Sequence, residues 1–212
     1  SRIVINNLKF QNCKFEQYIF LRVLASELSF DQCEFLRCSF ITGRYQGVYF
    51  NKCTVDSMAF AKINKLVDLR VNESSLDKFC IAPGMKVSGV SITSTSVIHS
   101  GFRGTVLEGL EIRDSQLHNS DFSAVSMQSA RLQNSSLKES LFVRVDLTAA
   151  HIERVDLSYC FMKAAILNST FLKRVSFFST ELGLIQTNKD TVQIDCLVER
   201  ANFIPRLEKS DV

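Results

Sequence analysis

The strongest constraint in this sequence is a large apolar residue at every fifth position. Counting in fives from Ile5 to Phe60 meets only apolar or aromatic residues, and most of them are Phe. Because 46% of the chain is hydrophobic, chance would give such a run roughly once in ten thousand trials. The spacing matches neither the period of a helix, about 3.6 residues, nor the two-residue period of a strand. The chain must therefore turn a corner once in every five residues.

The pattern covers most of the chain, with two shifts of one residue in its phase. One shift lies near 61–65 and the other near 82–86, where Pro83 and Gly84 predict a turn. From Val87 to Leu182 no polar residue occupies the repeated position. We therefore predict one continuous repeat over residues 1–189, with an insertion bulging from the coil at each shift.

A second position repeats two residues before each large one, and small residues occupy it. Ser, Thr and Ala are common there in the later part of the chain, and Cys in the earlier part. Four corners close a square coil of about twenty residues, and stacked coils lie about 4.8 Å apart. The predicted fold is all-β: a parallel β-helix, or solenoid, of about nine coils that are stable only when stacked. The predicted core includes Phe15, Phe35, Phe50, Phe102, Phe122 and Phe142, with Cys13, Cys33 and Cys53 beside them.

The segment 190–212 loses the five-residue pattern and allows two interpretations. Val192, Leu197, Val198, Ala201 and Ile204 fit one face of a short capping helix that ends near Pro205. The alternative is an irregular last coil, which the triplet Ala201-Asn202-Phe203 favours. Because the two ends of a β-helix expose strand edges, an end-to-end homodimer is also an expectation.

Several five-residue groups carry a more specific pattern. They include Ser120-Asp121-Phe122, Val145-Asp146-Leu147, Val155-Asp156-Leu157 and Ala201-Asn202-Phe203. The chain resembles the pentapeptide-repeat family, whose consensus is A-(D/N)-L-x-x, over about residues 3–185. The resemblance implies a right-handed quadrilateral β-helix. It implies little about function, because the motif residues build the core.

The cysteines predict reduced thiols. There are seven, an odd number, and we expect no signal peptide. Cys13, Cys33 and Cys53 recur every twenty residues, which suggests either a metal or redox ladder or an inward column of small apolar groups. We favour the inward column, because zinc sites use short paired spacings. We expect a cytoplasmic protein, or one secreted by bacteria into a host cytoplasm. Since the chain begins at Ser1 without Met, we also expect a piece of a longer protein.

No residue pattern predicts catalysis, a metal site or a cofactor. His99 and His118 fall on neighbouring coils, but no carboxylate occupies the matching positions of those two coils. We interpret them as surface residues, and His151 likewise. Ser and Thr are abundant, yet a convex rod offers no cleft that would desolvate a nucleophile. We therefore expect a chain that is not an enzyme.

Apolar and basic residues at outward positions predict a contact face for another protein. Leu141 and Phe161 precede core residues one coil apart and should face water. Exposed apolar groups beside Arg are typical of interfaces. The predicted partner-binding residues are Leu141, Val143, Arg144, Arg154, Tyr159, Phe161, Lys163, Phe171 and Arg174.

Three functional hypotheses remain open. The first is a protein-interaction module, since some secreted bacterial effectors, including ubiquitin-ligase types, are similar in carrying such β-helices. The second is a DNA-mimicking modulator of DNA gyrase or topoisomerase, which the resemblance suggests but the net charge of +3 opposes. The third is a structural spacer. We expect neither a nucleic-acid partner nor membrane insertion.

Overall fold

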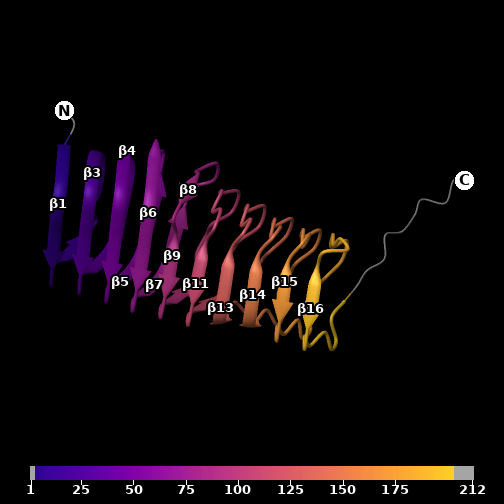
Figure 1. Ribbon diagram of the computed structural model, residues 1–212. Helices are drawn as coiled ribbons and strands as arrows, with labels where there is room; N and C mark the ends of the chain where they lie inside the picture. Colours follow the sequence, from indigo (N-terminus) through magenta and orange to yellow (C-terminus); the bar gives the residue numbers. More distant parts are fainter. Residues whose placement is uncertain (1–2, 203–212) are drawn as a thin grey trace, which may run out of the picture.

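A computed structural model describes residues 3–202, which form one rod of stacked coils with the N-terminus at one end (Figure 1). The strands are β1 (Ile3–Gln11), β2 (Lys14–Glu16), β3 (Ile19–Asp31), β4 (Glu34–Asn51), β5 (Thr54–Ala61), β6 (Lys65–Asn72), β7 (Ser75–Ile81), β8 (Val87–Ser88), β9 (Ser91–Thr93), β10 (Ser96–Ile98), β11 (Glu111–Arg113), β12 (Gln116–His118), β13 (Arg131–Ser136), β14 (His151–Asp156), β15 (Phe171–Lys173) and β16 (Val192–Ile194). Nowhere in residues 3–202 is there a helix long and apolar enough to cross a membrane.

The coils repeat every twenty residues, and all strand pairs between them are parallel. Phe10 pairs with Phe30, and Phe30 pairs with Phe50, so equivalent residues stack along the rod. This arrangement confirms the predicted parallel β-helix. The solenoid has about ten turns, one more than predicted, because the chain keeps coiling beyond Leu182.

Each coil has four sides, which we name in chain order. The first side carries Ile5, Ala25, Tyr45 and their equivalents in later coils. The second carries Phe10, Phe30 and Phe50, the third Phe15, Phe35 and Val55, and the fourth Phe20, Phe40 and Phe60. The residues before and after each of these central residues point outward. Since the sides follow one another around the coil, the second and fourth sides are opposite.

The corners are made by residues with positive φ. Two residues after each central residue, the backbone adopts the left-handed conformation, as at Ala124, Arg144 and Ala149. Early in the chain the strands run through these corners. Later, many corners are tight turns closed by a hydrogen bond, such as the one from the Val145 N–H to the Phe142 carbonyl, 3.2 Å. A positive φ at the third residue of such a turn is typical of type II.

Both predicted phase shifts are one-residue insertions. After the first, Lys65 pairs with Arg44, twenty-one positions earlier. The second contains a turn in which the Met85 N–H donates to the Ala82 carbonyl, 3.3 Å, and Gly84 has a φ of +79°.

A third insertion was missed by sequence reasoning, and it lies in 187–191. Ile166 pairs with Gln186, twenty positions on, but Phe171 pairs with Val192, twenty-one positions on. The polar Gln193 then takes a central position opposite Leu172, so the apolar pattern gives no signal there.

The predicted C-terminal capping helix is wrong for residues 190–202. Val192–Ile194 forms β16 on the edge of β15, and Leu197 and Asn202 pair with Ser176 and Glu181. The unpaired backbone groups of the preceding coil favour one more coil over a helix. The irregular last coil is therefore the correct alternative up to Asn202. Phe203, Ile204 and Pro205 lie outside the described residues.

The interior is a column of stacked rings and aliphatic groups. Phe102, Phe122 and Phe142 stack with centroid separations of 4.9 Å and 5.0 Å. The structure buries the expected core residues Phe35, Phe50, Phe102, Phe122, Phe142, Cys33 and Cys53. Cys13 and Phe15 are only half-buried, because they belong to the first described coil.

The small residues before each corner form hydrogen-bonded ladders. The Ser100 N–H donates to the Ser120 hydroxyl at 3.2 Å, and the Ser120 N–H donates to the Ser140 hydroxyl at 3.1 Å. A second ladder runs through Ser74, Thr95, Ser115 and Ser135. Buried backbone donors need partners, which explains why hydroxyls are frequent at this position.

We predict that Phe142→Ala lowers the free energy of unfolding by about 3–5 kcal/mol, because it empties a fully buried ring site. Phe161→Ala is the matched control, since that ring is 54% exposed, and it should cost less than about 1 kcal/mol. Urea unfolding followed by circular dichroism measures both. Equal losses for the two variants would contradict the inward and outward assignments.

A second prediction concerns the corners. Ala149 is exposed and has a φ of +59°, where glycine is less strained than alanine. Ala149→Gly should therefore raise the free energy of unfolding by about 0.5–1 kcal/mol. Ala150→Gly is the control at a buried neighbour with no positive φ, and it should destabilise. A loss of stability in Ala149→Gly would show that the corner carries no strain.

Candidate contact face

The most exposed apolar group in the later coils lies on the fourth side. Leu141 and Phe161 pair directly on adjacent coils, and their side chains are 41% and 54% exposed. Each precedes a residue that points into the core, so it must point outward. Val143 is half-buried on the same side. We call Leu141, Val143 and Phe161 the fourth-side patch.

Basic residues lie beside this patch. Lys163 follows Phe161 on the same side by two positions, and Arg144 occupies the corner toward the first side; both are exposed. Sequence reasoning missed Leu184, which is 43% exposed at the equivalent corner two coils beyond Arg144. The sequence did contain a signal for it, because a leucine two residues after a central position lies at an outward corner.

Tyr159 extends the apolar surface around the corner toward the third side. Its side chain is 51% exposed, and its ring packs edge-on against Phe178 with a centroid distance of 5.6 Å. The Arg200 guanidinium lies 5.5 Å from the centroid of the Phe178 ring. Phe178 therefore links the last described coil to this corner.

Three residues predicted for this face lie elsewhere, which corrects the sequence-based grouping. Phe171 is on the second side, where its ring stacks on His151 with a centroid distance of 4.6 Å. Arg154 and Arg174 stand at the corner between the second and third sides, where they line a shallow open groove. A step of ten residues moves halfway around a four-sided coil, so neighbours in sequence can face opposite directions.

Arg154 is also held in place by its neighbours. Its Nε donates to the Asn134 side-chain oxygen at 2.6 Å, and its guanidinium pairs with Glu153 at 3.0 Å. The groove beside it is lined by residues such as Asn134, Ser136 and Ser176.

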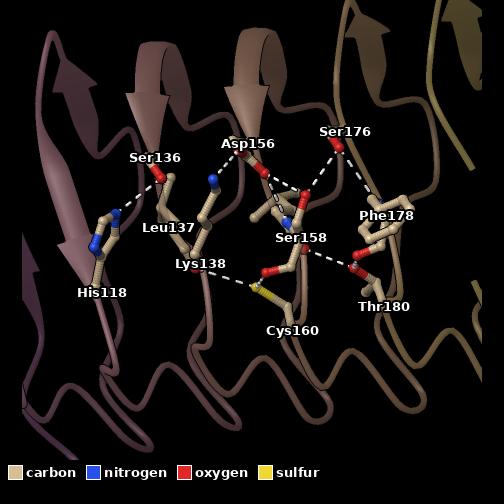
Figure 2. Close-up of polar contacts among 11 residues, drawn as sticks. His118, Ser136, Leu137, Lys138, Asp156, Ser158, Cys160, Ser176, Phe178 and Thr180 are labelled. Atoms are coloured by element: carbon tan, nitrogen blue, oxygen red, sulfur yellow. Dashed lines mark hydrogen bonds and ion pairs between the residues drawn. The ribbon is translucent and has the colours of Figure 1, made fainter.

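The cysteines are free thiols with a structural role. Burial raises the pKa of Cys53 to about 11 and that of Cys160 to about 12. The Cys160 Sγ donates to the Leu137 carbonyl at 3.1 Å (Figure 2). Within residues 3–202 no group of three or more His, Cys, Asp or Glu side chains could hold a metal ion.

The histidines find partners that sequence reasoning missed. His99 Nδ1 lies 3.0 Å from Asp77. Asp77 is on the coil before that of His99, whereas only the coils of His99 and His118 were compared in the sequence. His118 Nε2 lies 2.9 Å from the Ser136 hydroxyl, on the third side (Figure 2). The Ser136–His118 pair has the elements of a nucleophile and a base. No carboxylate of the described residues hydrogen-bonds His118, so the third member that would orient the base is missing there.

Asp156 is the centre of a polar network on the same side (Figure 2). It accepts from the Ser158 N–H at 2.9 Å and from Lys138 at 2.9 Å, and the Ser158 hydroxyl also contacts Ser176. Burial by itself would raise the pKa of Asp156, but the hydrogen bonds from Ser158 and Lys138 outweigh it, and the pKa is lowered.

This lowered pKa predicts a pH dependence. A carboxyl whose pKa is depressed on folding stabilises the native state above its unfolded pKa, about 3.8, and that stability is lost as the pH falls through the folded pKa. Asp156→Asn should therefore reduce the loss of stability below about pH 4, measured by urea unfolding across a pH series. Asp195→Asn is the control, at an exposed carboxyl. If both variants follow the parent curve, Asp156 contributes nothing to acid sensitivity.

Comparison with known proteins agrees with this geometry. Residues 126–163 match the family model described as Pentapeptide repeats, in 8 copies. No curated protein sequence matches the chain.

Solved structures with detectable similarity include three of low sequence identity. HetL, a pentapeptide repeat protein involved in heterocyst differentiation regulation in the cyanobacterium Nostoc, is 13% identical over 95% of this chain and 87% of its own, with a TM-score of 0.35. QnrB1, a plasmid-mediated fluoroquinolone resistance protein, is 16% identical over 88% of this chain and 92% of its own, with a TM-score of 0.41. Rfr23 from the cyanobacterium Cyanothece is 15% identical over 60% of this chain and 89% of its own, with a TM-score of 0.34. Residues 126–163 therefore carry pentapeptide repeats, and the five-residue coil geometry continues beyond them on both sides.

Proposed function

We propose that this chain is a non-catalytic protein-interaction module that binds its partner through the fourth-side patch. The observation that supports this most is the pairing of Leu141 with Phe161 on adjacent coils, both exposed to solvent. Exposed aliphatic and aromatic side chains at adjacent positions are unfavourable in water and are typical of interfaces.

The surroundings of the patch have the composition of an interface rim. Arg144 and Lys163 are exposed beside it, and Asp121 and Glu181 occupy the next outward positions along the same column. An apolar centre with a charged rim favours a partner that inserts apolar side chains and presents carboxylates toward Arg144 and Lys163.

The absence of catalysis is part of this proposal. Ser136 and His118 are both partly exposed on the third side, so water is not excluded from the pair. A rigid surface that displays side chains at fixed spacing suits binding better than chemistry. The resemblance to secreted bacterial effectors extends the proposal to a partner in a host cell.

The alternative functions have less support. A DNA mimic needs carboxylates in a continuous row, whereas the exposed charges beside the fourth-side patch include Arg144 and Lys163. A structural spacer would have no reason to keep Leu141 and Phe161 exposed.

We expect Phe161→Asp to weaken partner binding at least about thirtyfold, the size of a hot-spot loss, without unfolding the protein. The partner is first captured from bacterial and eukaryotic lysates, and its affinity for each variant is then measured by biolayer interferometry. Phe171→Asp is the matched control on the opposite side, and it should bind like the parent.

Two outcomes would contradict the proposal. Loss of binding in Phe171→Asp with retention in Phe161→Asp would move the contact face to the second side. Capture of gyrase or topoisomerase subunits would favour the DNA-mimic alternative instead.

A further inference from the structure

The charged residues of this rod are divided between its sides. Every Lys or Arg that forms an ion pair in the described chain lies on the second or third side or at their corners, as in Lys52–Glu73 at 3.6 Å and Lys138–Asp156 at 2.9 Å. Pairs between coils and within a coil compensate the charge of these cations. The Lys and Arg residues of the first and fourth sides form a separate group.

These other cations form a row where the fourth side meets the first. The row, which we call the basic edge, consists of Arg22, Arg44, Lys62, Lys65, Lys86 and Arg103. All six are exposed, and none makes an ion pair or a side-chain hydrogen bond within residues 3–202. The basic edge lies on coils that precede the fourth-side patch.

Three of these cations are stacked on consecutive coils. Arg44 pairs with Lys65 in the parallel register, and the pairing of Leu66 with Val87 sets Lys86 beside Lys65. Neighbouring strands lie about 4.8 Å apart, and like charges in such positions repel. The repulsion would be relieved by an anionic ligand.

Two carboxylates of the first side lie at its other corner, away from this row. Glu27 and Asp68 lie at the far corner of the first side, where Asp68 accepts a hydrogen bond from the Tyr49 hydroxyl at 2.8 Å. Asp68 also accepts two hydrogen bonds from Arg70. Asp68 is therefore engaged away from the basic edge.

The fourth side next to the basic edge carries mostly small and aliphatic residues over the same coils, with Ser39 as the polar exception. Its outward positions hold the small or aliphatic residues Ile41, Ala59, Ala61, Cys80, Ala82 and Gly101, which are half-buried. No carboxylate occupies an outward position of this side between Leu21 and Gly101. We call these six residues the small-residue floor.

We propose that the basic edge and the small-residue floor together bind an acidic amphipathic helix of a partner protein. Its apolar stripe would lie on the floor, and carboxylates on one flank would reach the basic edge. From Arg22 to Arg103 the row spans four coil steps, about 19 Å at strand spacing, which matches about 13 helical residues. The inference stands apart from the proposed function, because it uses different coils.

A nucleic acid fits these observations less well. Single strands are held by aromatic stacking as well as charge, and the outward positions of the first and fourth sides between Arg22 and Arg103 hold no aromatic residue. Phosphates would also make no use of Ala61, Ala82 and the rest of the floor. The charge row and the apolar floor together favour a peptide.

The test uses fluorescence polarisation with a labelled synthetic helix of about 16 residues, long enough to span the row. The helix carries a Leu and Ala stripe and Glu along one flank; a scrambled peptide of identical composition and a short DNA duplex are compared with it. The edge variant is Arg44→Gln with Lys65→Gln and Lys86→Gln. The control variant has the same charge change on the ion-paired sides: Lys14→Gln with Lys52→Gln and Lys78→Gln.

We expect the edge variant to bind the amphipathic helix about tenfold more weakly, the scale of three exposed ion pairs, and the control variant to change by less than about twofold. Ala61→Asn, which places a polar group on the floor without changing its charge, should also weaken binding, and salt should weaken it in the parent. Circular dichroism confirms that each variant is folded.

Four results would overturn the proposal. Equal losses in the edge and control variants would mean attraction by net charge alone. Equal binding of the scrambled peptide would mean that the floor is not used. Tighter binding of the duplex would assign the row to nucleic acid, and no binding of the helix at about millimolar concentration would leave the row without this role.

Discussion

The in-register stacking of one coil on the next is the interaction on which the rest of this structure depends. A single coil has no interior of its own, so Phe122 is buried only because Phe102 and Phe142 lie above and below it. The same stacking aligns the hydroxyls of Ser100, Ser120 and Ser140 with the backbone donors of the preceding coil. Core packing and hydrogen bonding therefore reinforce the same twenty-residue register.

This register also organises the surface. Each outward position repeats on the same side of every coil, so residues of one type at that position form a stripe along the rod. On the second and third sides the stripes alternate in charge and pair, as Lys138 does with Asp156. On the edge between the fourth and first sides they are basic and unpaired, and Arg44 stacks beside Lys65. The rod thus separates the sides that carry the ion pairs of Lys and Arg from an edge whose six cations form no ion pair within residues 3–202.

The fourth-side patch and the basic edge differ from the rest of the surface in two different ways. Leu141 and Phe161 stand out because apolar groups replace the acid seen at Asp121 in the same column. The basic edge differs from the ion-paired sides because no counter-charge accompanies it. Neither surface affects the interior, because the side chains that form them alternate with those that fill the core. Such surfaces can change in evolution without a cost to the fold.

The period of five and the small residue before each corner were enough to predict the β-helix, its phase shifts near 61–65 and 82–86, and an interior built from Phe35, Phe122 and Phe142. They sufficed because the same local geometry repeats in every coil and requires apolar residues at the inward positions. The third insertion was not predictable, since polar Gln193 occupies a central position there. The last coil was one of the two alternatives that the sequence left open. Sequence order also misled the grouping of Phe171 and Arg154 with Phe161, because distance along the chain does not reveal the side of the coil. Which cations pair with a neighbouring coil, as Lys138 does with Asp156, and which do not, as with Lys65, was decided only by the tertiary structure, since stacking alone brings residues about one coil apart together.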